Sequence, residues 1–218
     1  MTEQQIFNFN SNTIYSEDNF IKDSSNLAVI NYLLKFPNWE NNLINIYGEQ
    51  KSGKTFLLNI LKNKKNFKYY KNKDEFEKYF DHLFSNDKLI LDEIYPDNNK
   101  MFSLVDHFLV NKKYLVISSK TPITSHTVEL KDLKSRFSQF FLLEIKNPSD
   151  DLVYSLILKY FSDNQVYIKK ELIKSIVKKI DRSYLRINIF LSKLNNISII
   201  KKKKINHKLI NEVFQSMD

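Results

Sequence analysis

The chain has 218 residues and a net charge of +9, and 42% of its residues are hydrophobic and 27% are charged. This composition is typical of a globular protein and excludes a disordered or fibrous one. Because it has no cysteine, disulfides, thiolate metal sites and thiol nucleophiles are excluded. No apolar run approaches the roughly 18 residues of a membrane span, and residues 1–10 lack a signal-peptide pattern, so we expect a cytoplasmic protein without membrane association.

Segments with strand-like and helix-like patterns alternate through the first two-thirds of the chain. Short apolar runs predict strands at residues 43–47, 67–70, 88–92, 114–118 and 140–145. Helical patterns lie between them at residues 54–61, 74–84, 100–110 and 130–137, and a first helix, capped by Ser24 or Ser25, is expected to end near Phe36. Strands that alternate with helices indicate an α/β fold, with a parallel sheet covered by helices on both faces.

The pattern changes at Asn147, which precedes Pro148. Proline disfavours helical backbone in the residue before it, and Ser149 or Asp150 can cap a helix that follows. Beyond this point only helical patterns occur, each with one apolar stripe and lysines opposite. The two clearest stripes comprise Leu172, Ile173, Ile176, Val177 and Ile180, and Leu209, Ile210, Val213, Phe214 and Met217. We expect a flexible peptide at residues 1–12, an α/β domain at 13–146 and a helical lid domain at 147–218.

The only two glycines of the chain, Gly48 and Gly53, occupy the two glycine positions of the motif GxxxxGK[ST]. This motif follows an apolar strand and opens a helix, which is the context of a phosphate-binding P-loop. Glycines let the loop turn so that its N–H groups converge on phosphates, while Lys54 reaches the outer phosphates and the Thr55 hydroxyl binds Mg²⁺. The nucleotide-binding residues predicted here are Gly48, Glu49, Gln50, Lys51, Ser52, Gly53, Lys54, Thr55 and Phe56.

Two carboxylates, Asp92 and Glu93, end the apolar run at residues 88–92. In a P-loop protein the first of these carboxylates helps Thr55 to hold Mg²⁺, and the second can polarise the water that attacks the γ-phosphate. Asp92 is therefore a candidate metal-binding residue and Glu93 a candidate catalytic residue. The sequence leaves open whether Glu93 activates water or the site only binds nucleotide.

Only three of the 34 basic residues are arginines: Arg136, Arg182 and Arg186. A guanidinium binds phosphate in a forked geometry that lysine does not reproduce. We therefore expect Arg136 and Arg186 to contact nucleotide phosphates, with a surface ion pair as the alternative for each arginine. Ser118 and Ser119, at the end of a predicted strand, are either polar sensors of the γ-phosphate or ordinary residues of a strand end.

The positive charge is concentrated in the last third of the chain. Residues 1–146 carry 20 basic and 18 acidic residues, whereas residues 147–218 carry 14 and 7. This excess predicts an anionic partner such as nucleic acid, with lysines on solvated helix faces as the alternative.

These residues resemble the AAA+ module of the DnaA family of bacterial replication initiators, especially its short Hda-type relatives. The resemblance runs through the P-loop, the Asp92 and Glu93 pair, the strand ending at Ser119, the stretch 132–137 and the lid helix with Arg186. It implies a five-stranded parallel sheet with a C-terminal helical lid, and ATP or ADP with Mg²⁺ as cofactors. In such a module Asn19, Phe20 and Ile21 would lie near the adenine, Arg136 would be an arginine finger, and Arg186 would sense the nucleotide from the lid.

The resemblance also implies partners. Hda-type proteins dock on the sliding clamp of DNA polymerase and promote hydrolysis of the ATP bound to DnaA. Their clamp-binding peptide contains a glutamine and spaced apolar residues, which Gln4, Phe7 and Phe9 match here, with a frayed terminus as the alternative. The chain lacks the C-terminal helix-turn-helix of DnaA, so we do not expect sequence-specific DNA binding, while a homo-oligomer stays open.

Two other functions stay open beside regulation of replication initiation. One is a nucleic-acid-binding ATPase of helicase-loader or initiator type, acting through the basic lid and its lysines at residues 201–204. The other is an adaptor that holds ADP without turning it over.

Overall fold

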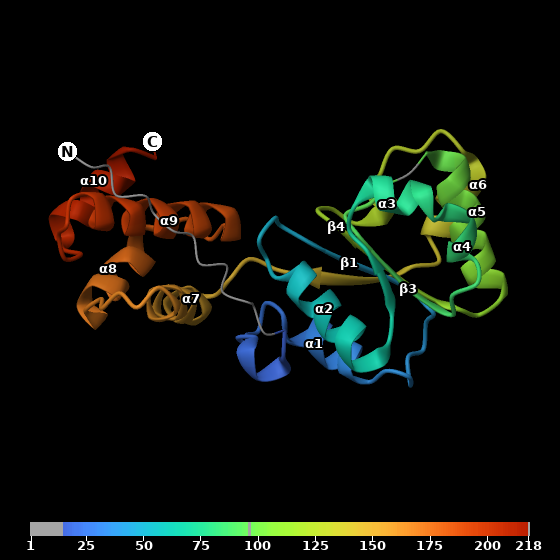
Figure 1. Cartoon of the computed structure of the whole chain (residues 1–218), viewed down its shortest axis with the longest axis horizontal. Helices are drawn as coiled ribbons and strands as arrows, with labels where there is room; N and C mark the ends of the chain where they lie inside the picture. The colour runs from blue at the N-terminus through green and yellow to red at the C-terminus, as the bar shows by residue number, and fades with distance from the viewer. Residues whose placement is uncertain (1–14, 96, 218) are drawn as a thin grey trace.

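The computed structural model, which describes residues 15–95 and 97–217, contains the expected parallel sheet (Figure 1). Its strands are β1 (Leu43–Gly48), β2 (Lys68–Tyr70), β3 (Lys88–Asp92), β4 (Tyr114–Ser119) and β5 (Phe141–Ile145). Their order in the sheet is β2-β3-β4-β1-β5, and every neighbouring pair is parallel. The prediction of a five-stranded parallel sheet is confirmed, with each observed strand within one residue of its expected bounds.

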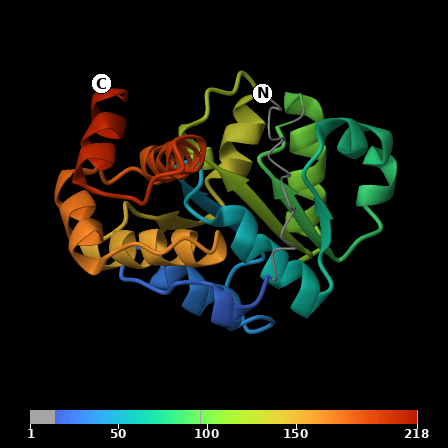
Figure 2. The ribbon, with the colours of Figure 1, turned by 60° about the vertical axis from the view of Figure 1, so that its left-hand side comes forward.

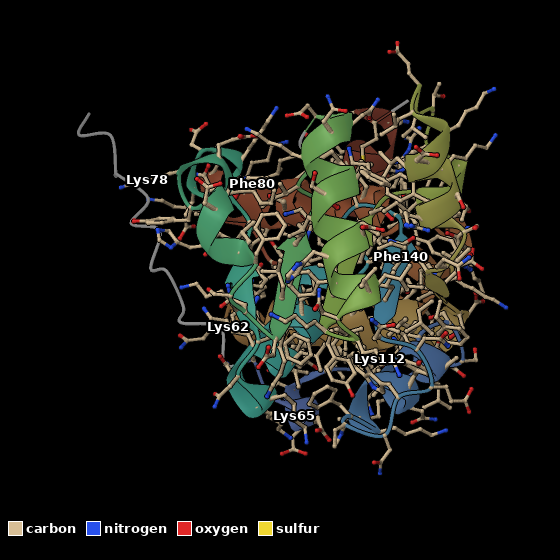
Figure 3. The ribbon with its side chains drawn as sticks, turned by 90° about the vertical axis from the view of Figure 1, so that its right-hand side faces the viewer. Lys62, Lys65, Lys78, Phe80, Lys112 and Phe140 are labelled. Carbon is tan, nitrogen blue, oxygen red and sulfur yellow. The ribbon has the colours of Figure 1, made fainter. Side chains whose placement is uncertain are left out.

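Helices cover both faces of this sheet. They are α1 (Leu27–Leu34), α2 (Lys54–Lys65), α3 (Lys73–Lys78), α4 (Phe80–Leu83), α5 (Asn98–Val110) and α6 (Lys131–Phe137), with short 3₁₀ turns at Glu17–Asn19 and Ile123–Ser125. Helices α1 and α2 pack on one face, against a core that includes Ile90 of β3. The neighbouring Leu89 and Leu91 point to the other face, where they pack with α3 to α6. Figure 3 looks onto this second face and shows α5 between α4 and α6.

Two of the expected helices differ from the structure in this region. The helix predicted at residues 74–84 is divided into α3 and α4 at Tyr79, where the backbone hydrogen bonds change from a spacing of four residues to one of three. The Tyr79 N–H still bonds the Glu75 carbonyl, but the His82 N–H bonds Tyr79, only three residues back. Helix α2 is longer than predicted and continues to Lys65.

The prediction that Ser24 or Ser25 caps the first helix is wrong. Helix α1 begins at Leu27, and the Asp23 carbonyl accepts the backbone N–H groups of Asn26 and Leu27 in the turn before it. The Ser25 hydroxyl lies 3.3 Å from the Tyr184 hydroxyl instead, far along the chain. The helix also ends at Leu34, two residues before the expected end.

The C-terminal part of the chain is entirely helical, as expected. It comprises α7 (Asp150–Asp163), α8 (Lys170–Lys179), α9 (Tyr184–Ile200) and α10 (His207–Gln215), which share a third apolar core. Figures 1 and 2 both show these orange and red helices beside the sheet. Ser149 caps α7 by accepting the Leu152 N–H at 3.1 Å. In the described ranges no helix is long and apolar enough to cross a membrane.

Asp23 ties the segment before α1 to the start of α7. Its carboxylate accepts hydrogen bonds from the Ser149 hydroxyl at 2.7 Å and from the Ser25 backbone N–H at 3.0 Å. Burial opposes ionisation, but the hydrogen bonds from Ser149 and Ser25 outweigh it and lower the pKa of Asp23 from 3.8 to about 2. Ionised Asp23 therefore stabilises the folded state.

We expect Asp23→Asn to lower the free energy of unfolding by about 1 kcal/mol near neutral pH, because one charge-assisted hydrogen bond is weakened. A lowered pKa stabilises the fold above the unfolded value of 3.8, and this contribution is lost as the pH falls toward about 2. Urea unfolding of both proteins from pH 7 to pH 2 should show their difference shrinking in that window. The exposed Asp81→Asn is the control, and a difference independent of pH would contradict the assignment.

Candidate functional site

The two glycines shape the loop between β1 and α2. Gly53 has φ of +98°, and a Cβ added there would lie 2.9 Å from the Phe20 ring. Gly48 has φ of +155°, and a Cβ added there would lie 2.7 Å from the Ile145 carbonyl oxygen. Both positions therefore exclude larger residues, for reasons of backbone conformation and of space.

Lys54 is held inside this loop. Its side chain is only 4% exposed, and its ammonium donates to the carbonyls of Gly48 at 2.8 Å and Glu49 at 3.0 Å. It also lies 3.2 Å from Glu93 Oε1. Ser52, in the same loop, has a buried hydroxyl without a hydrogen-bond partner among the described residues. A buried hydroxyl normally has such a partner, so the loop presents a donor suited to a ligand oxygen.

Asp92 is the buried acceptor at the end of β3. It is 2% exposed and accepts hydrogen bonds from Thr55 Oγ1 at 2.8 Å, Tyr69 Oη at 2.7 Å and Ser118 Oγ at 2.6 Å. Burial and the bond to Asp92 both raise the pKa of Tyr69, which keeps that hydroxyl protonated as a donor. Tyr69 was not predicted as a site residue, and its only signal is its place on the strand beside β3.

Glu93 follows Asp92 in a left-handed conformation, with φ of +56°. Its backbone N–H donates to Ser118 Oγ at 3.0 Å, so the Ser118 hydroxyl connects the two carboxylate residues. Of the two serines considered as sensors, Ser118 contacts this cluster. Ser119 is fully buried and accepts a hydrogen bond from the Asn45 amide at 2.8 Å.

A pocket of about 270 Å³ lies beside the loop. This volume is close to the lower end of the roughly 300–1,000 Å³ typical of small-ligand sites. One wall comes from the segment before α1 and from the P-loop, and the other comes from α7 and α9. The lining residues are Asn19, Phe20, Ile21, Asn26, Lys51, Ser52, Gly53, Phe56, Leu152, Leu156, Lys159, Tyr160, Asp163, Tyr184, Ile187, Asn188 and Leu191.

The remaining residues of the P-loop differ in their surroundings. Gln50 and Lys51 are exposed, and Lys51 lines the pocket. Glu49 points instead to the start of α9, where its carboxylate accepts the Tyr184 N–H at 2.6 Å and a hydrogen bond from the Ser183 hydroxyl. The structure thus brings the whole motif together with Asp92 and Glu93, and connects it to the C-terminal helices.

The three arginines do not line this pocket. Arg136 lies on α6, with its Nε 2.8 Å from Asp106 Oδ1 of α5. Arg182 pairs with Asp150 at 2.6 Å, and Arg186 lies 3.5 Å from Asp181. The roles predicted for Arg136 and Arg186 stay predictions.

Two further predicted regions lie elsewhere. The lysines at 201–204 are exposed in the turn between α9 and α10, where Lys201 pairs with Glu212. Gln4, Phe7 and Phe9 lie outside the described residues, so clamp binding stays a prediction. Within the described residues, no three or more histidine, aspartate or glutamate side chains form a group that could hold a metal ion.

Comparisons with known proteins place this fold. No family model matches the chain. The DnaA chromosomal replication initiator of Buchnera aphidicola subsp. Cinara cedri is 26% identical over an alignment of 234 positions, gaps included, which covers 94% of this chain and 54% of that protein. The chain therefore spans about half the length of this curated relative.

Solved structures agree with this similarity. Domain III of Thermotoga maritima DnaA superposes with a TM-score of 0.75 at 18% identity, over 93% of this chain and 96% of that one. A DnaA bound to AMPPCP and single-stranded DNA superposes with a TM-score of 0.63 at 19% identity, over 83% of this chain and 64% of that one. The Holliday junction branch migration motor RuvB of T. maritima superposes with a TM-score of 0.69 at 16% identity, over 93% of this chain and 72% of that one. The parallel sheet, the C-terminal helices and these similarities together show that the chain has the fold of DnaA domain III.

Proposed function

We propose that this chain binds ATP or ADP with Mg²⁺ and regulates the initiation of chromosomal replication. The observation that carries nucleotide binding is the junction of the P-loop with the 270 Å³ pocket, since Lys51, Ser52 and Gly53 belong to both. Phosphates would lie on the loop, and the base and ribose would enter the pocket between the loop and the C-terminal helices. The relative bound to AMPPCP supports the same class of ligand.

The residues present suit this ligand. Lys54 would place its buried ammonium on the outer phosphates, and the Ser52 hydroxyl, which has no hydrogen-bond partner within the described part of the chain, would bond a phosphate oxygen. Thr55 and Asp92, already hydrogen-bonded at 2.8 Å, would hold Mg²⁺ together with the phosphates. Bound Mg²⁺ would neutralise charge on the phosphates. Glu93, whose side chain is 38% exposed, could accept a proton from an attacking water.

Replacing Lys54 tests nucleotide binding. A charge-assisted hydrogen bond contributes about 1.5–3 kcal/mol, so we expect Lys54→Ala to weaken the binding of fluorescent Mg·ADP by roughly 10- to 100-fold. Fluorescence anisotropy measures the affinity, and Lys65→Ala, at the far end of α2, is the matched control. Absence of binding by the wild type at millimolar nucleotide, or equal affinities for both variants, would contradict the proposal.

The regulatory role rests on Arg136 and on the resemblance to Hda. In this role the chain would dock on the sliding clamp through Gln4, Phe7 and Phe9 and present Arg136 to the ATP of DnaA. The Arg136 side chain is 34% exposed on α6 and does not line the chain's own pocket, which suits a residue that acts on a neighbouring molecule. An arginine supplied to another protein's nucleotide can raise hydrolysis by roughly 10³–10⁵-fold.

This role is tested by measuring the hydrolysis of DnaA-bound ATP in the presence of this protein and of sliding clamp loaded on DNA. We expect the wild type to accelerate hydrolysis and Arg136→Ala to lose nearly all of this effect, because the γ-phosphate loses its arginine. Arg182→Ala, which removes an arginine paired with Asp150, is the matched control, and deletion of residues 1–10 tests the clamp peptide. The role is wrong if the wild type has no effect or if Arg136→Ala accelerates hydrolysis equally.

A second candidate function is binding of nucleic acid by the C-terminal helices. The exposed lysines at 201–204 favour it. Lys201 pairs with Glu212, but Lys202, Lys203 and Lys204 have no ion pair among the described residues, so their charges are available to phosphates. Polyanion binding through such lysines weakens steeply with salt.

Replacement of Lys202, Lys203 and Lys204 by glutamine should reduce the affinity for single-stranded DNA at 50 mM salt by at least roughly tenfold, because phosphate contacts depend on charge. A salt titration of labelled oligonucleotide binding measures this, with single- and double-stranded arms. Unchanged affinity in the triple variant would exclude this surface. Retention of ADP after purification, with no turnover by the wild type or by Glu93→Gln, would instead favour an adaptor.

A further inference from the structure

Glu49 joins the P-loop to a helix that begins 135 residues later. Its Oε2 accepts the Tyr184 N–H at 2.6 Å, and its Oε1 accepts a hydrogen bond from the Ser183 hydroxyl. Ser183 is the N-cap of α9, and its hydroxyl also accepts the Arg186 N–H at 3.1 Å. Glu49 and Ser183 thus share the capping of this helix.

This contact is favourable for α9. The first N–H groups of a helix lack partners within the helix, and a carboxylate at this end also interacts with the positive end of the helix dipole. The acceptor normally lies next to the helix in sequence, as Ser149 does for α7. Here part of the cap comes from the loop that would bind phosphate. The start of α9 is therefore fixed relative to that loop.

Tyr184 is held from a second side as well. Its hydroxyl lies 3.3 Å from the buried Ser25 hydroxyl, and its side chain is 6% exposed. The segment before α1 is also joined to the start of α7, because the Ser149 hydroxyl donates to the Asp23 carboxylate at 2.7 Å. Polar contacts thus connect the two walls of the pocket, and among these three contacts that of Glu49 comes from the P-loop itself.

The orientation of Glu49 also removes a conflict of charge. A carboxylate directed at bound phosphates would repel them, but this one is satisfied by the donors of α9. Glu49 therefore has no favourable contact to offer to a phosphate. Its effect on a ligand would act through the position of α9, which lines the pocket with Tyr184, Ile187 and Asn188.

We propose that Glu49 is a positioning residue that latches the start of α9 onto the P-loop and so keeps a nucleoside enclosed in the pocket. The inference rests on the proposed binding of nucleotide and names a determinant of its release. The base and ribose leave when α9 separates from Glu49, whereas the phosphates are held by the loop and by Lys54.

Release of fluorescent ADP, measured by stopped-flow displacement with excess unlabelled ADP, tests this latch. We expect Glu49→Ala to release the nucleotide roughly 10- to 100-fold faster, because two hydrogen bonds to a carboxylate are lost. Ser183→Ala should act in the same direction with a smaller effect. In the double variant the two effects should multiply less than fully, because both substitutions remove the hydrogen bond between Ser183 and Glu49. Glu171→Ala, in the exposed first turn of α8, should release ADP at the wild-type rate.

A second ligand separates the latch from a general loss of structure. Tripolyphosphate has no base or ribose and would occupy only the phosphate loop, so its affinity should not be weakened by Glu49→Ala. In the absence of nucleotide, hydrogen exchange of the Tyr184 amide should be faster in Glu49→Ala than in the wild type, because its acceptor is lost. Glu49→Gln keeps an acceptor oxygen without the charge and should give intermediate release.

The outcomes distinguish the latch from the proposed function. A wild type that binds no ADP contradicts nucleotide binding, and the latch with it. A wild type that binds ADP, with Glu49→Ala releasing it at the same rate, overturns the latch alone. The latch is also overturned if Glu49→Ala weakens the binding of tripolyphosphate as much as the binding of ADP. It is overturned as well if the effects of Glu49→Ala and Ser183→Ala on ADP release multiply fully in the double variant.

Discussion

The arrangement of the site depends on one buried carboxylate. Asp92 is 2% exposed, and an ionised carboxylate at such a position is strongly unfavourable unless donors surround it. The donors come from the start of α2, from β2 and from β4, through Thr55, Tyr69 and Ser118. Because Thr55 is the last residue of the P-loop motif, the same hydrogen bonds that satisfy Asp92 also fix the loop at the carboxyl edge of the sheet.

The fold was largely predictable because its signals are local. Strands buried on both faces appear as continuous apolar runs, as β3 and β4 do, so their bounds were nearly correct. The P-loop was predictable for the same reason, since its motif is contiguous and places Gly53 where φ is positive. The break at Tyr79 was missed because its apolar pattern continues across it, with Phe76 and Leu83 both buried.

Contacts between distant segments were not predictable from the sequence. The bond from Tyr69 to Asp92 requires β2 to lie beside β3, and sequence order alone does not determine which strands are neighbours. The bonds of Glu49 depend on where α9 begins relative to the P-loop, and Ser25 faces Tyr184 rather than α1 for the same reason. These contacts join the sheet to the C-terminal helices, so they determine how the pocket is closed.

The central claim is that nucleotide phosphates bind at the P-loop, and the glycine content of this chain allows a direct measurement. Gly48 and Gly53 are the only glycines, so a spectrum of the glycine-selectively ¹⁵N-labelled protein reports on this loop alone. Titration with Mg·ADP should shift both backbone amide resonances in a saturable manner, because the N–H groups of the loop would contact phosphates. If both resonances stay unchanged at millimolar Mg·ADP, the account is contradicted.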